Sequence, residues 1–234
     1  TQFASISFTG SGNDGINVGP APQAGETKHL HRMMLQSTST TLHPATFLLC
    51  DYLMHYPLID GDDTAQQDLD NTATLPRYTD GAGVQMMGVI TTPMAANAVM
   101  TVSYTNQAGV SGRTSTSAAL FGTVVGTVLS SSNSTTASNS ASPFLPLQGG
   151  DSGVRSIEAV TLASGAGGFF ALVLVRPLAQ VSLREGVTAN EFETLRHRGQ
   201  LPEIKTGAYL NLIYCTAQAG TAVTLRGQFD FVWR

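Results

Sequence analysis

The chain has 234 residues, of which 12% are charged and 42% hydrophobic, and its formal net charge is −4 at pH 7. It lacks a cluster of Lys and Arg, so we expect no nucleic-acid partner. The longest apolar run, Phe169 to Val175, is far shorter than the roughly 20 residues that a membrane-spanning helix needs, and we expect no membrane association. The first ten residues do not resemble a signal peptide, which favours synthesis in the cytoplasm.

Gly, Ser, Thr, Ala and Val abound, a composition typical of strands joined by tight turns. The clearest alternation of apolar and polar residues lies in 98–104 and in 223–234, where Gly227 falls on the inner face as a bulge or a point of close approach. In chain order, the strand-like segments are 4–8, 84–91, 98–104, 122–129, 154–162, 169–175, 209–216 and 223–234. Many short strands without strand–helix alternation predict an all-β fold, an antiparallel β-sandwich with jelly roll as the favoured topology.

One or two short helical elements are also expected. Residues 188–197 combine capping-box spacing, Thr188 and then Glu191, with two apolar residues three apart, which predicts a short surface helix. Residues 43–59 are apolar throughout and fit neither period, so we expect part strand and part helical turn. The segment "LASGAGG", residues 162–168, has the composition of a hairpin loop.

The predicted domain organisation is an extended N-terminal arm, 1–26, followed by a single β-sandwich domain, 27–234. A polar Ser/Thr-rich stretch, 129–142, is expected to be a flexible loop within that domain. Three apolar residues of the arm, Phe3, Ile6 and Phe8, are candidate contacts to a partner protein or to another subunit. The alternative is that this segment forms an edge strand of its own sandwich.

The sequence Gly150-Asp151-Ser152-Gly153 is similar to the nucleophile loop of chymotrypsin-like serine proteases. Such a site needs an imidazole oriented by a carboxylate, and no histidine stands in the surroundings typical of that family. Asp, Ser and flanking glycines are also typical of a tight turn, which would lead into the strand that begins near Val154. We therefore interpret Ser152 as a turn residue and expect no catalytic residues.

We also expect no metal site and no cofactor. His29 and His31 would share a face in a strand, but spacing indicates no third ligand for zinc. The acidic stretch from Asp60 to Asp70 lacks the ligand pattern of an EF-hand, and we interpret it as a solvated loop, with binding of a divalent cation as the alternative. No phosphate-binding Gly-rich motif or Cys-x-x-Cys pair occurs. Cys50 and Cys215 lie among apolar residues, which favours buried reduced thiols.

Several segments in order resemble those of a tailed-bacteriophage virion structural protein, of the head decoration or cement family. They are "DYLMHYPLIDGDD", "TLPRYTDGAGVQ", "TVSYTNQAGVSGR", "FLPLQGGDSGVRSIEAVTL", "FFALVLVRPLAQVSLRE" and "AYLNLIY". The resemblance covers roughly residues 47–234. It implies a non-enzymatic β-sandwich subunit on the capsid exterior of the virion, which binds the major capsid protein and forms a homo-oligomer, a trimer or a dimer. The alternative within virions is a neck, tail or host-attachment component with a carbohydrate- or receptor-binding sandwich.

Overall fold

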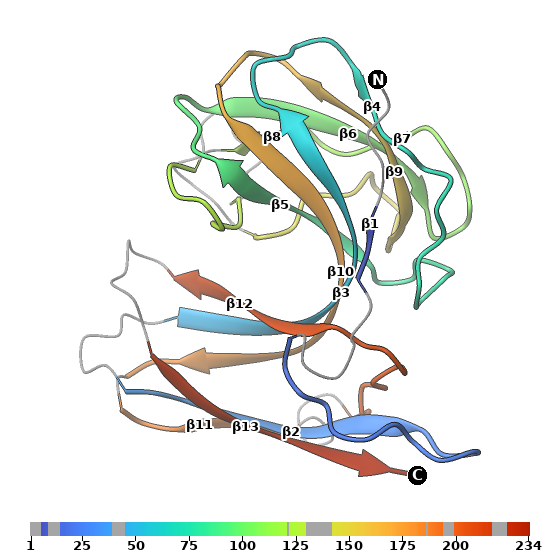
Figure 1. Cartoon of the computed structure of the whole chain (residues 1–234), viewed down its shortest axis with the longest axis vertical. Coiled ribbons are helices and arrows are strands. Elements are labelled where there is room, and N and C mark those ends of the chain that lie inside the picture. The colour runs from blue at the N-terminus through green and yellow to red at the C-terminus, as the bar shows by residue number, and fades with distance from the viewer. Residues whose placement is uncertain are drawn as a thin grey trace. The chain divides into compact units, whose positions relative to one another are not determined.

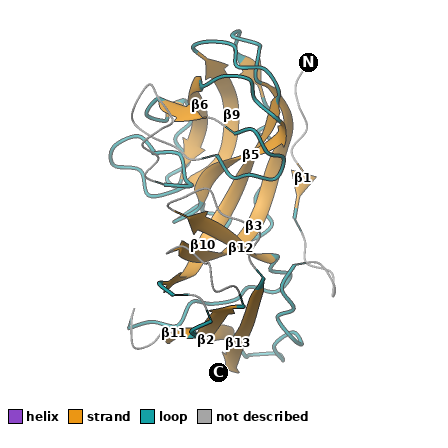
Figure 2. Cartoon of the chain, turned by 90° about the vertical axis from the view of Figure 1, so that its left-hand side faces the viewer, coloured by secondary structure: helices purple, strands orange, loops and turns teal. Residues whose placement is uncertain are grey.

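The computed structural model describes residues 6–8, 15–38, 45–120, 122–129, 142–185, 187–193, 199–216 and 224–234. All regular structure in these residues is β-strand, as the sequence predicts (Figures 1 and 2). The strands are β1 (Ile6–Ser7), β2 (Lys28–Ser37), β3 (Ala45–Asp60), β4 (Gln67–Asp68), β5 (Gln85–Thr92), β6 (Ala98–Asn106), β7 (Arg113–Thr114), β8 (Ala118–Leu120), β9 (Val154–Leu162), β10 (Phe169–Leu183), β11 (Asn190–Glu193), β12 (Leu210–Thr216) and β13 (Leu225–Trp233). Within the described residues, no helix has the length and hydrophobicity that crossing a membrane requires.

The chain forms two compact units, each built from two stretches of sequence. Unit 1 combines Thr1–Phe8 with Tyr52–Arg176, and unit 2 combines Thr9–Asp51 with Pro177–Arg234. The boundaries fall inside two long strands, β3 and β10, so each of these strands contributes to both units. This division differs from the single domain expected over 27–234, because composition along the chain gives no sign of a boundary inside a continuous strand.

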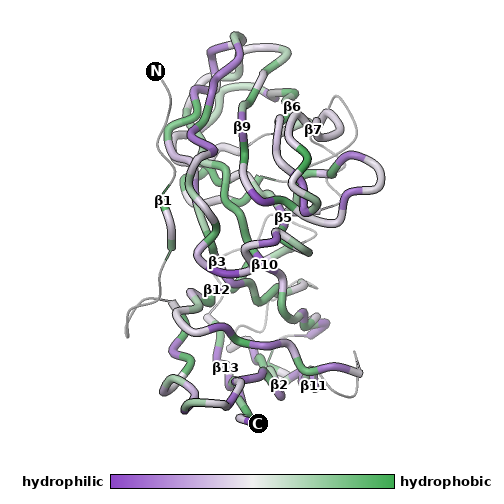
Figure 3. The backbone as a smooth tube through the Cα atoms, turned by 90° about the vertical axis from the view of Figure 1, so that its right-hand side faces the viewer, coloured by the Kyte–Doolittle hydropathy of each residue, from purple (hydrophilic) through white to green (hydrophobic). Residues whose placement is uncertain are grey.

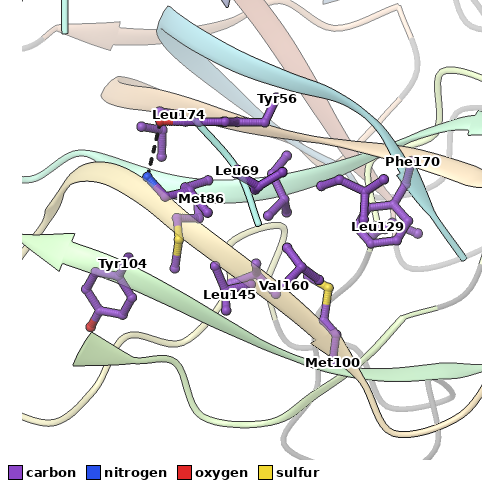
Figure 4. Close-up of a cluster of buried hydrophobic side chains, with 14 of the residues drawn as sticks. Tyr56, Leu69, Met86, Met100, Tyr104, Leu129, Leu145, Val160, Phe170 and Leu174 are labelled. Carbon is purple, nitrogen blue, oxygen red and sulfur yellow. Dashed lines mark hydrogen bonds between the residues drawn. The ribbon is translucent and has the colours of Figure 1, made fainter. Parts of the chain in front are cut away.

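Unit 1 is a sandwich of two sheets. One sheet has the order β1-β3-β10-β5, and the other has the order β4-β9-β6-β7, with β8 also paired to β6. The core between them contains Tyr56 of β3, Phe170 and Leu174 of β10, Met100 of β6 and Val160 of β9, all at most 1% exposed (Figure 4). Burying these large apolar side chains, about 1.5 to 3 kcal/mol for each, is the main force that holds the sheets together.

Tyr56 joins the two sheets of unit 1 by a polar contact inside the core. Its hydroxyl oxygen accepts a hydrogen bond of 3.1 Å from the backbone amide of Ile157 in β9, drawn as the dashed line in Figure 4. Burial raises the pKa of Tyr56 to about 12, so the phenol is neutral. The buried hydroxyl thus has a partner, which removes most of the cost of burying it.

Unit 2 has a second core. The sheet β11-β2-β13 supplies Leu30, Met33 and Leu35 of β2, while Phe47 and Leu49 of β3 come from the strand that pairs with β12. Phe229 and Phe231 of β13 pack on this cluster, as the alternation in 223–234 predicts. In both units hydrophobic stretches run along the strands, where hydrophilic residues alternate with them (Figure 3).

Most predicted strands are present, and β9 has the predicted bounds. Residues 122–129 form only an isolated bridge, between Val128 and Val89, instead of a strand. The helical turn expected within 43–59 is wrong, because Ala45–Asp60 is strand throughout. This strand carries buried residues on both faces and enters two cores, so its apolar residues keep neither period.

Two further expectations are corrected. The predicted helix at 188–197 is wrong in its first part, since Asn190–Glu193 is strand β11, paired with Met33 and Met34 of β2 among others; residues 194–198 lie outside the described residues. Tertiary pairing therefore overrides the local helix signal. "LASGAGG" is not a hairpin loop, because β9 and β10 belong to different sheets of unit 1 and the segment crosses between them.

The N-terminal arm is described only in part. Ile6–Ser7 is strand β1, residues 15–26 have no strand, and the rest of 1–14 except Phe8 lies outside the described residues. Most of the Ser/Thr-rich stretch, 130–141, also lies outside them. Cys50 and Cys215 are both free thiols, as expected, but only Cys50 is buried, whereas Cys215 is partly exposed.

Candidate functional site

The protease-like loop of unit 1 is centred on the carboxylate of Asp151, whose side chain is 3% exposed. Its oxygens accept hydrogen bonds from the Tyr104 hydroxyl at 2.6 Å, from the Asn106 amide at 2.7 Å and from Arg113 Nε at 2.9 Å. The Arg113 hydrogen bond is the largest of the contacts that lower the pKa of Asp151 to about 2, against the opposing effect of burial. The carboxylate is therefore ionised and bound to groups of β6 and β7.

Ser152 lies beside this network on the surface. It is exposed, and its backbone amide donates to Gln107 Oε1 at 3.1 Å, as does the amide of Gly153 at 3.2 Å. A triad would require an imidazole within hydrogen-bond reach of the Ser152 hydroxyl and a carboxylate to orient that imidazole. The groups bound to this loop through the contacts above are instead a phenol, two amide side chains and a guanidinium. The contacts of the loop are those of a structural turn.

The two glycines of the motif serve different purposes. Gly150 has φ +89°, a conformation that side chains disfavour, and it stands in the turn closed by the hydrogen bond from the Asp151 amide to the Gln148 carbonyl. Gly153 is required by space, because a Cβ there would lie 2.0 Å from the carbonyl oxygen of Gly81. Sequence reasoning found the turn but not this close approach of a distant segment.

The carboxylates between Asp60 and Asp70 are spread over separate turns. Asp60 Oδ1 accepts from the Asp62 amide at 2.9 Å, Asp62 Oδ1 from the Gly167 amide at 2.7 Å, and Asp63 Oδ1 from the Ala65 amide at 2.9 Å. Among the described residues, no group of three or more His, Cys, Asp or Glu has the arrangement to hold a metal ion. The acidic stretch is thus a series of side-chain-capped turns.

His29 and His31 lie in β2, and each binds groups of the protein. His29 is hydrogen-bonded to the Thr27 hydroxyl at 2.8 Å and to the Leu201 carbonyl at 3.2 Å. His31 Nε2 lies 3.8 Å from Glu193 Oε1 of β11. The two imidazoles therefore have separate sets of partners.

Of the candidate contact residues of the arm, Ile6 is exposed and Phe8 packs against unit 1. Ile6 is 48% exposed on strand β1, which pairs with His55 and Met54 of β3. The ring of Phe8 packs on His55, with centroids 4.8 Å apart, and Arg77 binds the Phe8 carbonyl at 3.1 Å. Phe3 lies outside the described residues. The segment 6–8 thus forms an edge strand of its own sandwich, the alternative reading of the sequence, and leaves Ile6 open to solvent.

A second exposed apolar point of unit 1 is the turn at Val124 and Val125. These side chains are 62% and 60% exposed, although the turn is held to β5 by hydrogen bonds from Gly126 N to Ile90 O at 2.8 Å and from Ile90 N to Thr127 O at 2.9 Å. Because the turn is held by hydrogen bonds, these valines would lose little conformational entropy if they bound a partner. Sequence reasoning placed a strand here, and no signal in the sequence indicates the exposure.

Unit 2 contains a buried lysine that fastens residues 16–22 to β2. Lys28 is 3% exposed, and its ammonium donates to the carbonyls of Val18, at 2.9 Å, and of Pro20. The Trp233 ring centroid lies 5.2 Å from Lys28 Nζ, and burial lowers the pKa of Lys28. A cavity of about 330 Å³ lies between this segment and residues 204–208, but the donor groups of Lys28 point to the carbonyls.

Comparisons of the chain with models of protein families, with curated proteins and with solved structures found no match. The indications of function therefore come from the residues and their geometry.

Proposed function

We propose that the chain is a non-enzymatic structural protein of a tailed-bacteriophage virion, a cement or decoration protein that binds the outside of the capsid and stabilises contacts between major capsid proteins. The virion class in this proposal rests on the resemblance of residues 47–234 to virion proteins. The structural observation that supports a role in attachment is the pair of exposed valines, Val124 and Val125, on a turn fixed to β5.

The polar side chains that the sequence offered as candidate catalytic or metal-binding groups instead bind other groups of the protein, which supports a role in adhesion. Asp151 is engaged by Tyr104, Asn106 and Arg113, and the acidic stretch caps its own turns. A protein that acts by adhering needs a rigid frame and several contact points, each of which is weak. Because a capsid presents its subunits repeatedly, linked weak contacts combine into tight attachment.

The test is binding to purified phage heads that lack the protein. We expect Val125→Asp to reduce occupancy of the heads at least tenfold, whereas Thr123→Asp, an exposed control in the same loop, leaves occupancy unchanged. Ile6→Asp and its neighbour Ser7→Asp form a second matched pair for the arm. These single substitutions test the arm more specifically than a deletion of residues 1–20 would. The deletion would also remove the backbone carbonyls that bind Lys28.

Copy number in the intact particle distinguishes the two kinds of virion component. Quantitative mass spectrometry should find copies in proportion to the major capsid protein. A few copies per particle would favour the neck, tail or host-attachment alternative. Equal head binding by all four variants and wild type would remove these apolar points as the means of attachment.

A further inference from the structure

Strand β13 of unit 2 is a long edge strand with a regular backbone. It is the last strand in the sheet β11-β2-β13, and no described residue pairs with its outer edge. Its nine residues contain no proline, and its charged residues, Arg226 and Asp230, lie on the face away from the core. An unprotected edge of this length is a template for pairing with another strand.

The hydrogen bonds to β2 define which backbone groups face outward. The Thr224 carbonyl accepts from the Thr38 amide at 3.0 Å, and Arg234 exchanges two hydrogen bonds with Thr27. Since alternate residues of a strand bond to the same neighbour, the even-numbered residues of β13 bond to β2, and the odd-numbered ones turn their amides and carbonyls outward. The irregularity in this ladder is an extra residue of β2, His31, so β13 keeps its alternation.

The outer face of β13 carries opposite charges four residues apart. Arg226 is exposed, and Asp230, whose side chain is 30% exposed, is held by Arg32 Nε at 2.7 Å and by Gln228 Nε2 at 2.8 Å. These contacts fix the direction of the carboxylate and leave part of it accessible. A strand that carries Arg and Asp in this spacing is complementary to its own antiparallel copy.

We propose that β13 pairs antiparallel with β13 of a second copy, about a twofold axis at Gln228. In this register, Arg226 faces Asp230 of the second copy, and Asp230 faces Arg226 of the second copy. Gly227 and Phe229 of opposite copies form pairs whose outward amides and carbonyls bond to each other. Two three-stranded sheets thereby become one continuous sheet.

The charges select this register over its neighbours. A shift that centres the pairing on Phe229 places Arg226 opposite Val232, and one that centres it on Gly227 places Arg226 opposite Gln228. Only the axis at Gln228 forms both charge pairs, and it does so at positions where facing side chains are closest. The contact uses the same patch on both copies, so it closes as a dimer. This inference is independent of the proposed function, because it requires no capsid.

The test is a charge exchange, read by sedimentation equilibrium. Wild type should be dimeric, and Arg226→Glu and Asp230→Lys should each weaken the dimer by about tenfold or more, because each creates two like-charge pairs. An equal mixture of the two variants should restore a dimer of wild-type affinity, since each forms opposite-charge pairs with the other. Arg184→Glu, at an exposed position of the same unit, is the control and should stay dimeric.

Two further readouts separate pairing from a change in fold. Thermal unfolding of each variant identifies any loss of stability, and the restored mixed dimer shows that both variants remain folded. In the wild-type dimer, the amides of Leu225, Gly227 and Phe229 should exchange with solvent at least tenfold more slowly than in Arg226→Glu. A monomeric or trimeric wild type, or variants that dimerise as wild type does, would overturn the proposal.

Discussion

The Tyr104 hydroxyl of β6 donates a hydrogen bond of 2.6 Å to the carboxylate of Asp151 and accepts one of 2.9 Å from the Gln148 amide. One phenol thus binds both ends of the turn that contains Gly149 and Gly150. Burial, and then the bond to Asp151, raise the pKa of Tyr104 to about 12, so the proton stays on the phenol. The loop that resembles a nucleophile loop is attached to the core of the sandwich through this contact.

The Asp151 carboxylate gives unit 1 a dependence on acid pH. Its folded-state pKa of about 2 lies below the ordinary 3.8, so its stabilising contribution is complete above about pH 5 and is lost as the pH falls towards 2. Asp151→Asn should lower the thermal unfolding midpoint at pH 7, and the difference from wild type should shrink between about pH 5 and 2. Ser152→Ala is the matched control, and it should change the free energy of unfolding by no more than about 0.5 kcal/mol. A fluorophosphonate should not label Ser152 in the wild-type protein. A constant difference across this range would contradict the assignment.

Gly153→Ala should destabilise unit 1 by about 3 kcal/mol, because the added Cβ would lie 2.0 Å from the Gly81 carbonyl oxygen and only backbone movement relieves the clash. Gly149→Ala, in the same loop, meets nothing within 4 Å and should change the free energy of unfolding by less than about 0.5 kcal/mol. Urea denaturation of both variants measures the contrast. Similar effects at the two positions would show that the close approach of Gly81 to Gly153 does not constrain the loop.

His55 should make folding less favourable below neutral pH. Burial lowers its pKa beneath the ordinary 6.5, and its buried Nδ1 has no hydrogen-bond partner among the residues that the structure describes. As the pH falls through 6.5, the unfolded chain binds the proton first, so stability decreases until the folded-state pKa is reached. Unfolding free energies measured from pH 8 to 5 should fall more steeply for wild type than for His55→Phe. The two curves should run parallel above pH 7.5, and parallel curves throughout would contradict this prediction.

Lys28→Met should loosen residues 16–22 of unit 2, because three backbone carbonyls lose their donor. We expect a loss of about 1 to 2 kcal/mol and faster cleavage near Gly19 in limited proteolysis. Lys205→Met is the control, because Lys205 lines the same cavity as Lys28. Its ammonium pairs with Glu203 at 2.6 Å but is 39% exposed, so the change should stay below about 1 kcal/mol. Equal cleavage rates in both variants would mean that Lys28 does not fasten this segment.

Local patterns in the sequence identified the regular strands and the turn that contains Ser152. Residues 98–104 and 154–162 alternate or run apolar because each packs in one core, and the turn is encoded by Gly150 within four residues of chain. By contrast, β2 was not predicted, since "KHLHRMMLQS" has an extra residue, His31, that breaks its alternation. The prediction of a helix failed over Asn190–Glu193, because the pairing of this segment with β2 is a nonlocal contact.

The sequence by itself determined that this is an all-β protein with a structural turn at Asp151 and Ser152, because strand period and turn chemistry act over a few residues. The tertiary structure alone decided that the chain folds into two units that share β3 and β10, that Ile6 and Val125 are exposed, and that β13 ends a sheet. Those properties depend on which distant segments meet, and no local pattern encodes the partner of a strand.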